Sequence, residues 1–228
     1  MANPNFEEIE ACVFDAYGTL FDVHSAAAYL KPELGENADQ MSKIWRHKQL
    51  QYTWLRSLMG RYVDFWQVTG DALDFAMQAT GIENPQLRAR LMELYLKLDA
   101  YPEVADILAK LKAAGKKTAI LSNGEPSMLI AAAKSAEIYS SLDAVLSVES
   151  VGVFKPHPSV YQLAVDQLKV AANHISFQSS NGWDAHAASA FGFSVAWVNR
   201  FDQPPENIPA TPHAQIKTLS DLPDLLGI

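Results

Sequence analysis

The 228-residue sequence contains a single cysteine and no apolar run long enough to cross a lipid bilayer. One cysteine excludes an internal disulfide and any zinc site built on paired cysteines, and it is compatible with a reducing compartment. The first residues, MANPNFEEIEA, have no basic segment followed by an apolar one, so they lack the pattern of a secretory signal. We therefore expect a soluble, cytoplasmic protein.

Positive charge is also scarce, with 18 Lys and Arg against 26 Asp and Glu and a formal net charge of −8. This balance argues against a nucleic acid or an anionic membrane as partner. It does not exclude a small anionic ligand, because the local charges of a site can oppose the global sign. Apolar residues, in contrast, are abundant. They make up 49% of the total, which is enough to build a full hydrophobic core.

Five short apolar runs have the character of buried parallel strands, because most of them are continuous rather than alternating. They are residues 11–15, 117–122, 142–148, 175–180 and 194–199. Helical patterns separate the last four runs. Strands that alternate with helices predict an α/β fold with a doubly wound parallel sheet.

The interval between the first and second runs contains no good strand. It contains helical patterns instead, at about 26–31, 39–59, 63–80 and 85–98. We expect residues 23–98 to form an inserted α-helical cap subdomain over the carboxyl edge of a core made of residues 1–22 and 99–228. The 39–59 helix has a second face besides its apolar stripe, so this face should meet a cleft, a partner subunit or both.

Polar side chains follow the carboxyl ends of four predicted strands. They are Asp15 and Thr19; Ser122 and Asn123; Lys155; and Ser179, Ser180, Asn181 and Asp184. One such residue alone is more typical of a helix cap. Because the carboxyl ends of parallel strands meet at one edge of a sheet, the four sets together predict a site there.

The segments DAYGTL (15–20), LSNG (121–124), KPHPSVY (155–161) and SSNGWDA (179–185) resemble, in this order and spacing, the haloacid dehalogenase superfamily. The combination is most similar to its L-2-haloacid dehalogenases, and the resemblance runs from about residue 9 to residue 200. It implies a Rossmann-like core with an inserted helical cap, in agreement with the fold expected from the residue pattern.

Tyr17 bears on the reaction. Most superfamily members transfer phosphoryl groups with magnesium, and they carry a second Asp where this chain has Tyr17. The general acid is therefore missing, and Asp184 alone is acidic in the 179–184 loop. A halide leaves without a proton, so we expect metal-independent, cofactor-free hydrolysis of short (S)-2-haloalkanoic acids to (R)-2-hydroxyalkanoic acids. A magnesium-dependent phosphatase or mutase, or a non-catalytic carboxylate-binding module, are the alternatives.

The resemblance also implies roles for single residues. Asp15 is the nucleophile, and a neighbouring cation, Lys155, keeps it ionised. Thr19 and Ser179 orient it. Lys155 and Asp184 both remain candidates for activating the hydrolytic water, which the resemblance places near three side chains: Asn181, Asp184 and Tyr161.

The substrate site is implied in the same way. Ser122, with backbone N–H groups near Tyr17 and Leu20, binds the substrate carboxylate, and Arg46 with Asn123 receives the halide. The apolar pocket is formed by Tyr17, Leu50, Phe65 and Trp183. Without the resemblance, Arg46 is more typical of a solvated helix residue. Trp183 then has ordinary core packing as an alternative, and Tyr161 has the alternative of a core tyrosine whose hydroxyl is satisfied by Asp184.

Two further expectations concern flexibility and assembly. Position 182 is glycine, which should loosen the loop beside Trp183. Superfamily members of this kind are commonly homodimers joined partly through cap helices, so a homodimer is expected. The partners are then a second copy, the 2-haloacid and the released halide, with no nucleic acid and no membrane.

Overall fold

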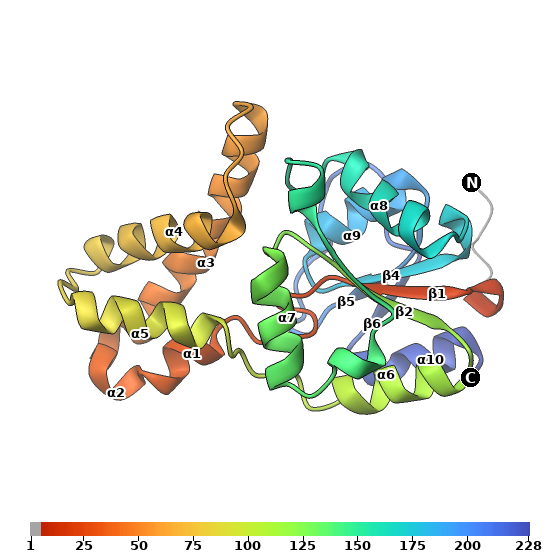
Figure 1. Cartoon of the computed structure of the whole chain (residues 1–228), viewed down its shortest axis with the longest axis horizontal. Helices are drawn as coiled ribbons and strands as arrows, with labels where there is room; N and C mark the ends of the chain where they lie inside the picture. The colour runs from red at the N-terminus through yellow and green to blue at the C-terminus, as the bar shows by residue number, and fades with distance from the viewer. Residues whose placement is uncertain (1–5) are drawn as a thin grey trace.

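The structure is a computed structural model, and it describes residues 6–228 (Figure 1). Part of the predicted core segment 1–22, and part of the N-terminal segment interpreted as lacking a secretory signal, lie outside the described residues. Within residues 6–228, no helix combines the length and the apolar character that a membrane span requires.

The centre of the fold is a parallel sheet of six strands in the order β3-β2-β1-β4-β5-β6. The strands are β1 (Ala11–Phe14), β2 (Lys117–Ser122), β3 (Ala144–Ser147), β4 (Ile175–Ser179), β5 (Ser194–Val198) and β6 (Ala214–Ile216). This confirms the predicted fold class. The sequence analysis missed β6, because three residues of mixed polarity carry no periodic signal.

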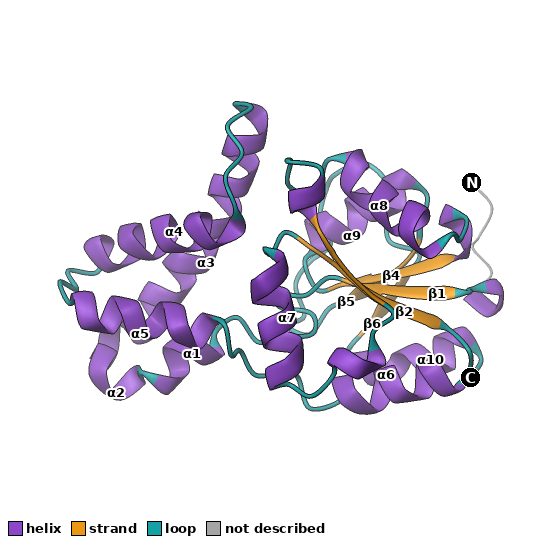
Figure 2. Ribbon diagram, viewed as in Figure 1, coloured by secondary structure: helices purple, strands orange, loops and turns teal. Residues whose placement is uncertain are grey.

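Helices cover both faces of the sheet, as Figure 2 shows. Since β1, β2 and β3 step in one direction and β4 and β5 in the other, right-handed crossovers put their helices on opposite faces. The helices of the core are α6 (Val104–Ala113), α7 (Pro126–Ser135), α8 (Pro158–Leu168), α9 (Gly182–Phe191) and α10 (Leu222–Leu226). The reversal of direction at β1 creates the crevice where such folds bind ligands.

Five helices follow β1 and form the cluster on the left of Figure 1. They are α1 (Ser25–Tyr29), α2 (Lys31–Leu34), α3 (Ala38–Leu58), α4 (Phe65–Ala79) and α5 (Pro85–Tyr95). Asp64 and Asn84 begin α4 and α5, because their side chains accept hydrogen bonds from backbone N–H groups of the first turn. We propose that residues 23–98 are the cap, with residues 1–22 and 99–228 as the core.

The two chain segments that join this helical cluster to the sheet run side by side. The backbone N–H of Asp22 donates to the carbonyl of Asp99 at 2.8 Å, and the N–H of Tyr101 donates to the carbonyl of Leu20 at 2.9 Å. Phe21 and Ala100 form an antiparallel bridge between them. The connection is therefore short and paired, and it sits directly after the turn that carries Asp15, Tyr17 and Thr19.

Candidate active site

Asp15 directly follows β1, the strand that pairs with β2 on one side and β4 on the other. The register places it beside Ser179 at the end of β4 and close to Ser122 at the end of β2. Its side chain is only 9% exposed. The three strand ends that the sequence analysis singled out therefore meet at one buried carboxylate.

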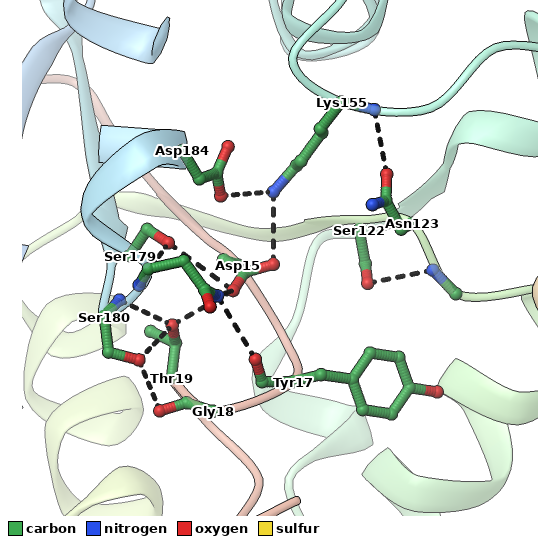
Figure 3. A network of polar contacts seen from close by, with 12 residues as sticks. Asp15, Tyr17, Gly18, Thr19, Ser122, Asn123, Lys155, Ser179, Ser180 and Asp184 are labelled. Carbon is green, nitrogen blue, oxygen red and sulfur yellow. Dashed lines mark hydrogen bonds and ion pairs between the residues drawn. The ribbon is translucent and has the colours of Figure 1, made fainter. Parts of the chain in front are cut away.

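Lys155 lies between two carboxylates (Figure 3). Its ammonium is 3.1 Å from Asp15 Oδ1 and 2.8 Å from Asp184 Oδ2, and its side chain is 1% exposed. Burial alone would lower the pKa of Lys155, but the charges of Asp15 and Asp184 outweigh burial and raise it above its ordinary value. Lys155 is therefore a cation, and two carboxylates share it.

The other oxygen of Asp15 faces three neutral donors. Asp15 Oδ2 accepts from Asn181 Nδ2 at 2.8 Å, from Thr19 Oγ1 at 3.2 Å and from Ser179 Oγ at 3.5 Å. These donors come from the turn after β1 and from the end of β4. The arrangement fixes the carboxylate plane, and among residues 6–228 the ammonium of Lys155 is the one hydrogen-bond partner of Oδ1.

Asp184, on the first turn of α9, is fully buried. The Tyr161 hydroxyl donates to its Oδ1 at 2.7 Å. Burial raises the pKa of Asp184, while the charge of Lys155 opposes this rise. Burial and the carboxylate of Asp184 also raise the pKa of Tyr161 well above its ordinary value, so Tyr161 serves as a hydrogen-bond donor.

Arg46 reaches this cluster from the helical cap. It lies on α3, and its Nη2 donates to the backbone carbonyl of Tyr17 at 3.0 Å and to Asn181 Oδ1 at 3.3 Å. Its Nη1 donates to Gln49 Oε1 at 2.8 Å. Arg46 is thus no solvated helix residue, since its guanidinium bridges α3 and the turn next to Asp15.

Tyr17 points away from the polar cluster, as Figure 3 shows. Its ring packs against Phe65 with centroids 5.4 Å apart and against Tyr95 at 5.5 Å. Burial is the main reason that the pKa of Tyr17 lies well above its ordinary value. The side chain that replaces the second Asp of phosphoryl-transfer members therefore builds an apolar wall and cannot act as an acid near neutral pH.

Three of the predicted substrate-binding groups are placed nearby with their own partners. Ser122 Oγ accepts from the Gly124 N–H at 3.1 Å, which leaves its hydroxyl proton for another acceptor. Asn123 Oδ1 accepts from the Lys155 N–H at 2.9 Å and so supports the lysine loop. The N–H of Leu20 donates to the Ala16 carbonyl at 2.9 Å, so this donor is already used within its own turn.

Trp183 and Leu50 are the remaining residues of the predicted apolar pocket. Trp183 meets Trp54 of α3 edge-on, with centroids 5.3 Å apart, and lines a cavity of about 820 Å³ together with Phe154 and Phe191. Asp15 does not line this cavity. Leu50 is half-buried one turn after Arg46 on α3.

Gly182 is the first residue of α9 and so belongs to a helix. A Cβ at this position would come within 2.9 Å of Glu206 Cγ. The space above the glycine is therefore filled by the Glu206 side chain, and the expectation of a loosened loop is not what the packing shows.

Two residues without a predicted role take part in the network. The Ser180 N–H donates to Thr19 Oγ1 at 2.9 Å, and the Ser180 hydroxyl donates to the Gly18 carbonyl, so Ser180 ties β4 to the Asp15 turn. Gln49 holds Arg46 as described above. The helical spacing of three residues between Arg46 and Gln49 was the available signal, because residues three apart on a helix are neighbours.

The superfamily resemblance raises the question of magnesium. Both buried carboxylates converge on the ammonium of Lys155, and the remaining donors on Asp15 are hydroxyl and amide groups. Within residues 6–228, no three His, Cys, Asp or Glu side chains cluster in a way that could hold a metal ion. The side chains present do not fit a hard divalent cation, which prefers several free oxygen ligands.

A doubly wound sheet with an inserted helical cap, a buried aspartate after its first strand and a lysine beside that aspartate together are typical of the haloacid dehalogenase fold. The family model for haloacid dehalogenase-like hydrolases matches residues 9–192, and the chain belongs to this family.

Curated and solved proteins are similar over nearly the whole chain. (S)-2-haloacid dehalogenase 1 of Pseudomonas sp. (strain CBS-3) is 46% identical over 96% of this chain and 97% of its own. A solved dehalogenase with an intermediate complex is 45% identical, with a TM-score of 0.95 over 97% of this chain and 99% of its own. The L-2-haloacid dehalogenase from Xanthobacter autotrophicus, solved with chloropropionic acid covalently bound, is 40% identical, with a TM-score of 0.90 over 96% of this chain and 98% of its own.

Proposed function

We propose that the protein hydrolyses short (S)-2-haloalkanoic acids to (R)-2-hydroxyalkanoic acids through an ester on Asp15, without a metal ion. The observation that carries this proposal is the pairing of a buried nucleophile, held by Lys155, with Tyr17 at the position of the missing general acid. The chemistry then requires a leaving group that departs unprotonated. Relatives at 40–46% identity are (S)-2-haloacid dehalogenases, and one is solved with chloropropionic acid covalently bound.

In the first step, Asp15 Oδ1 attacks C2 of the substrate in line with the carbon–halogen bond. The new C–O bond forms as the C–X pair leaves with the halide, which inverts C2 and leaves an ester on Asp15. Oδ1 is the better nucleophile, because Oδ2 already accepts three hydrogen bonds. Arg46 supplies positive charge where the halide departs, and the Ser122 hydroxyl donates to the substrate carboxylate.

In the second step, water attacks the ester carbonyl, and the C–O bond between Asp15 and the substrate stays intact until the tetrahedral intermediate collapses. The negative charge develops on Oδ2, which already faces Thr19, Ser179 and Asn181 as donors. Asp184 takes the proton from the attacking water in this proposal, because Lys155 is held as an ammonium without a free lone pair. When the tetrahedral intermediate collapses, this proton passes to the alkoxide oxygen of the departing 2-hydroxy acid, and Asp15 is regenerated as a carboxylate.

We expect (S)-2-chloropropanoate to yield equal amounts of chloride and (R)-2-hydroxypropanoate, at a rate that a chelator leaves unchanged. A halide-release panel of fluoro-, chloro- and bromo-acids with and without chelator measures this, with (R)-2-chloropropanoate as the stereochemical control. Turnover of a phosphate ester that requires added magnesium, with no halide from any haloacid, would establish the phosphatase alternative instead.

The proposal extends to a cytoplasmic homodimer. The free, buried Cys12 suits a reducing compartment. The carboxyl end of α3 projects from the cap in Figure 1, and Leu55, Leu58 and Met59 are exposed there by 45%, 85% and 69%. Such a group of large apolar side chains on one helix end supports contact with a second copy.

The dimer prediction is tested by changing this helix end. Leu58→Glu with Met59→Glu should convert the dimer to a monomer in sedimentation equilibrium, because like charges cannot be buried unpaired in an apolar contact. Tyr139→Ser, which changes an exposed aromatic residue of the core, is the control and should stay dimeric. A monomeric wild-type protein at micromolar concentration would contradict the assembly.

A further inference from the structure

Gln49 is the centre of a buried hydrogen-bonded cluster inside the cap, among residues that are otherwise mostly apolar or aromatic. Its side chain is 1% exposed. Its Nε2 donates to Thr69 Oγ1 at 2.8 Å, and the Tyr95 hydroxyl lies 3.0 Å from Nε2 and 3.1 Å from Oε1. Its Oε1 also accepts from Arg46 Nη1 at 2.8 Å. Every polar atom of this amide has a partner.

This hydrogen-bonded cluster joins three helices. Gln49 lies on α3, Thr69 on α4 and Tyr95 on α5. Thr69 is fixed in turn, because its hydroxyl donates to the Phe65 carbonyl at 2.7 Å. The indole of Trp45 donates to the Thr69 carbonyl at 2.9 Å. The position of the Gln49 amide is therefore set by the packing of the whole cap.

The same hydrogen-bonded cluster is linked to Asp15 through Arg46. The guanidinium is held at Nη1 by the cap and at Nη2 by Tyr17 O and Asn181 Oδ1. The amide of Asn181 in turn donates to Asp15 Oδ2 at 2.8 Å. An arginine side chain has several rotatable bonds, and a second anchor removes much of the conformational freedom that it would otherwise keep.

The chemistry of the acceptor matters as well as its place. Gln49 offers a neutral amide oxygen, which orients the guanidinium without cancelling its charge. A carboxylate at the same position would form an ion pair and reduce the positive charge available to an arriving anion. Packing alone does not call for an amide here, because methionine has nearly the same length and needs no hydrogen bonds.

We propose that Gln49, supported by Thr69 and Tyr95, is a positioning residue that aims the Arg46 guanidinium at the departing halide while leaving its charge uncompensated. This inference rests on the proposed dehalogenase activity. It adds a group of cap residues that determines the rate at which poor leaving groups are expelled. Chloride is a poorer leaving group than bromide, so it depends more on the charge that Arg46 supplies.

The experiment measures halide release in a single turnover, which isolates the first chemical step from hydrolysis of the ester. In Gln49→Met we expect chloride release from chloroacetate to fall about 10- to 100-fold. Bromide release from bromoacetate should fall several-fold less, so the bromide-to-chloride rate ratio rises. Gln49→Glu should raise this ratio as well, because it keeps the anchor but neutralises the cation. Tyr95→Phe is a milder variant that should shift the ratio in the same direction.

Two controls separate positioning from loss of structure. Gln51→Met changes a half-buried glutamine of the same helix that accepts a hydrogen bond from Lys48, and it should leave both rates unchanged. In an Arg46→Ala background, Gln49→Met should not change the ratio further, because its effect passes through Arg46. Equal losses for chloride and bromide, or a further change in the Arg46→Ala background, would overturn the proposal. Absence of halide release from the wild-type protein would instead refute the proposed function.

Discussion

Replacing Asp15 with asparagine is expected to abolish halide release while the protein stays folded. The Asp15→Asn side chain keeps the shape of the carboxylate but has no charge with which to attack carbon, and losing a nucleophile costs at least about 10⁴-fold in rate. The fold should tolerate the change, because Asp15 and Asp184 share one ammonium and removing one charge relieves their repulsion. Steady-state halide assays and thermal unfolding measure the two effects.

Labelled water makes the covalent step visible. After a single turnover in oxygen-18 water, mass spectrometry of the peptide containing Asp15 should show the label on that carboxylate. The product of that turnover should carry the original Asp15 oxygen. Asp166→Asn, an exposed carboxylate that accepts from Gln162, is the matched control and should keep full activity. Oxygen-18 in the product of the first turnover, or full activity in Asp15→Asn, would contradict the ester mechanism.

Replacing Lys155 with methionine is the second change with a large expected effect. Without the ammonium, two buried carboxylates face each other, and the pKa of the pair must rise. A proton shared between the two carboxylates would make Asp15 a weaker nucleophile. We expect a loss of at least about 10³-fold in kcat/KM at pH 7. Activity should recover partly as the pH rises, because higher pH restores the carboxylate.

Stability should change in the opposite sense with pH. Breaking a buried ion pair by removing one partner costs about 3–5 kcal/mol. This cost should be largest at neutral pH and smaller in acid, where a proton replaces the missing cation. Lys134→Met, a surface change beside Tyr139, is the control and should leave the pH–rate profile and the unfolding free energy nearly unchanged. Lys155→Arg keeps the charge, and it should retain more activity than Lys155→Met. A Lys155→Met profile with the wild-type pH dependence would contradict the role of Lys155.

The sequence pattern predicted five of the six strands of the sheet. Continuous apolar runs and the polar residues after them were enough to predict that Asp15, Ser122, Lys155 and Ser179 lie at one edge. The reason is general, since parallel strands all end at the same edge. The short β6 was missed, because its three residues carry no periodicity that distinguishes a strand from a loop.

Other parts of the site depended on packing that no local pattern encodes. Gly182 was expected to loosen a loop, yet it begins α9 under the Glu206 side chain. The N–H of Leu20 was expected to bind substrate, yet it is used by the Ala16 carbonyl. Gln49 had no sequence signal beyond its spacing from Arg46, because its partners come from α4 and α5.

The sequence by itself determined which side chains this site can use: an aspartate after the first strand, a lysine that can pair with it, and a tyrosine where phosphoryl-transfer members carry a second aspartate. These side chains are set by the amino-acid sequence, and the reactions open to them follow from their functional groups. Only the tertiary structure decided the geometry: which oxygen of Asp15 faces Lys155, and how Arg46 reaches Asn181 from the cap. Those contacts join residues that are more than 100 positions apart in the sequence. Their distances depend on how whole helices and strands pack against one another.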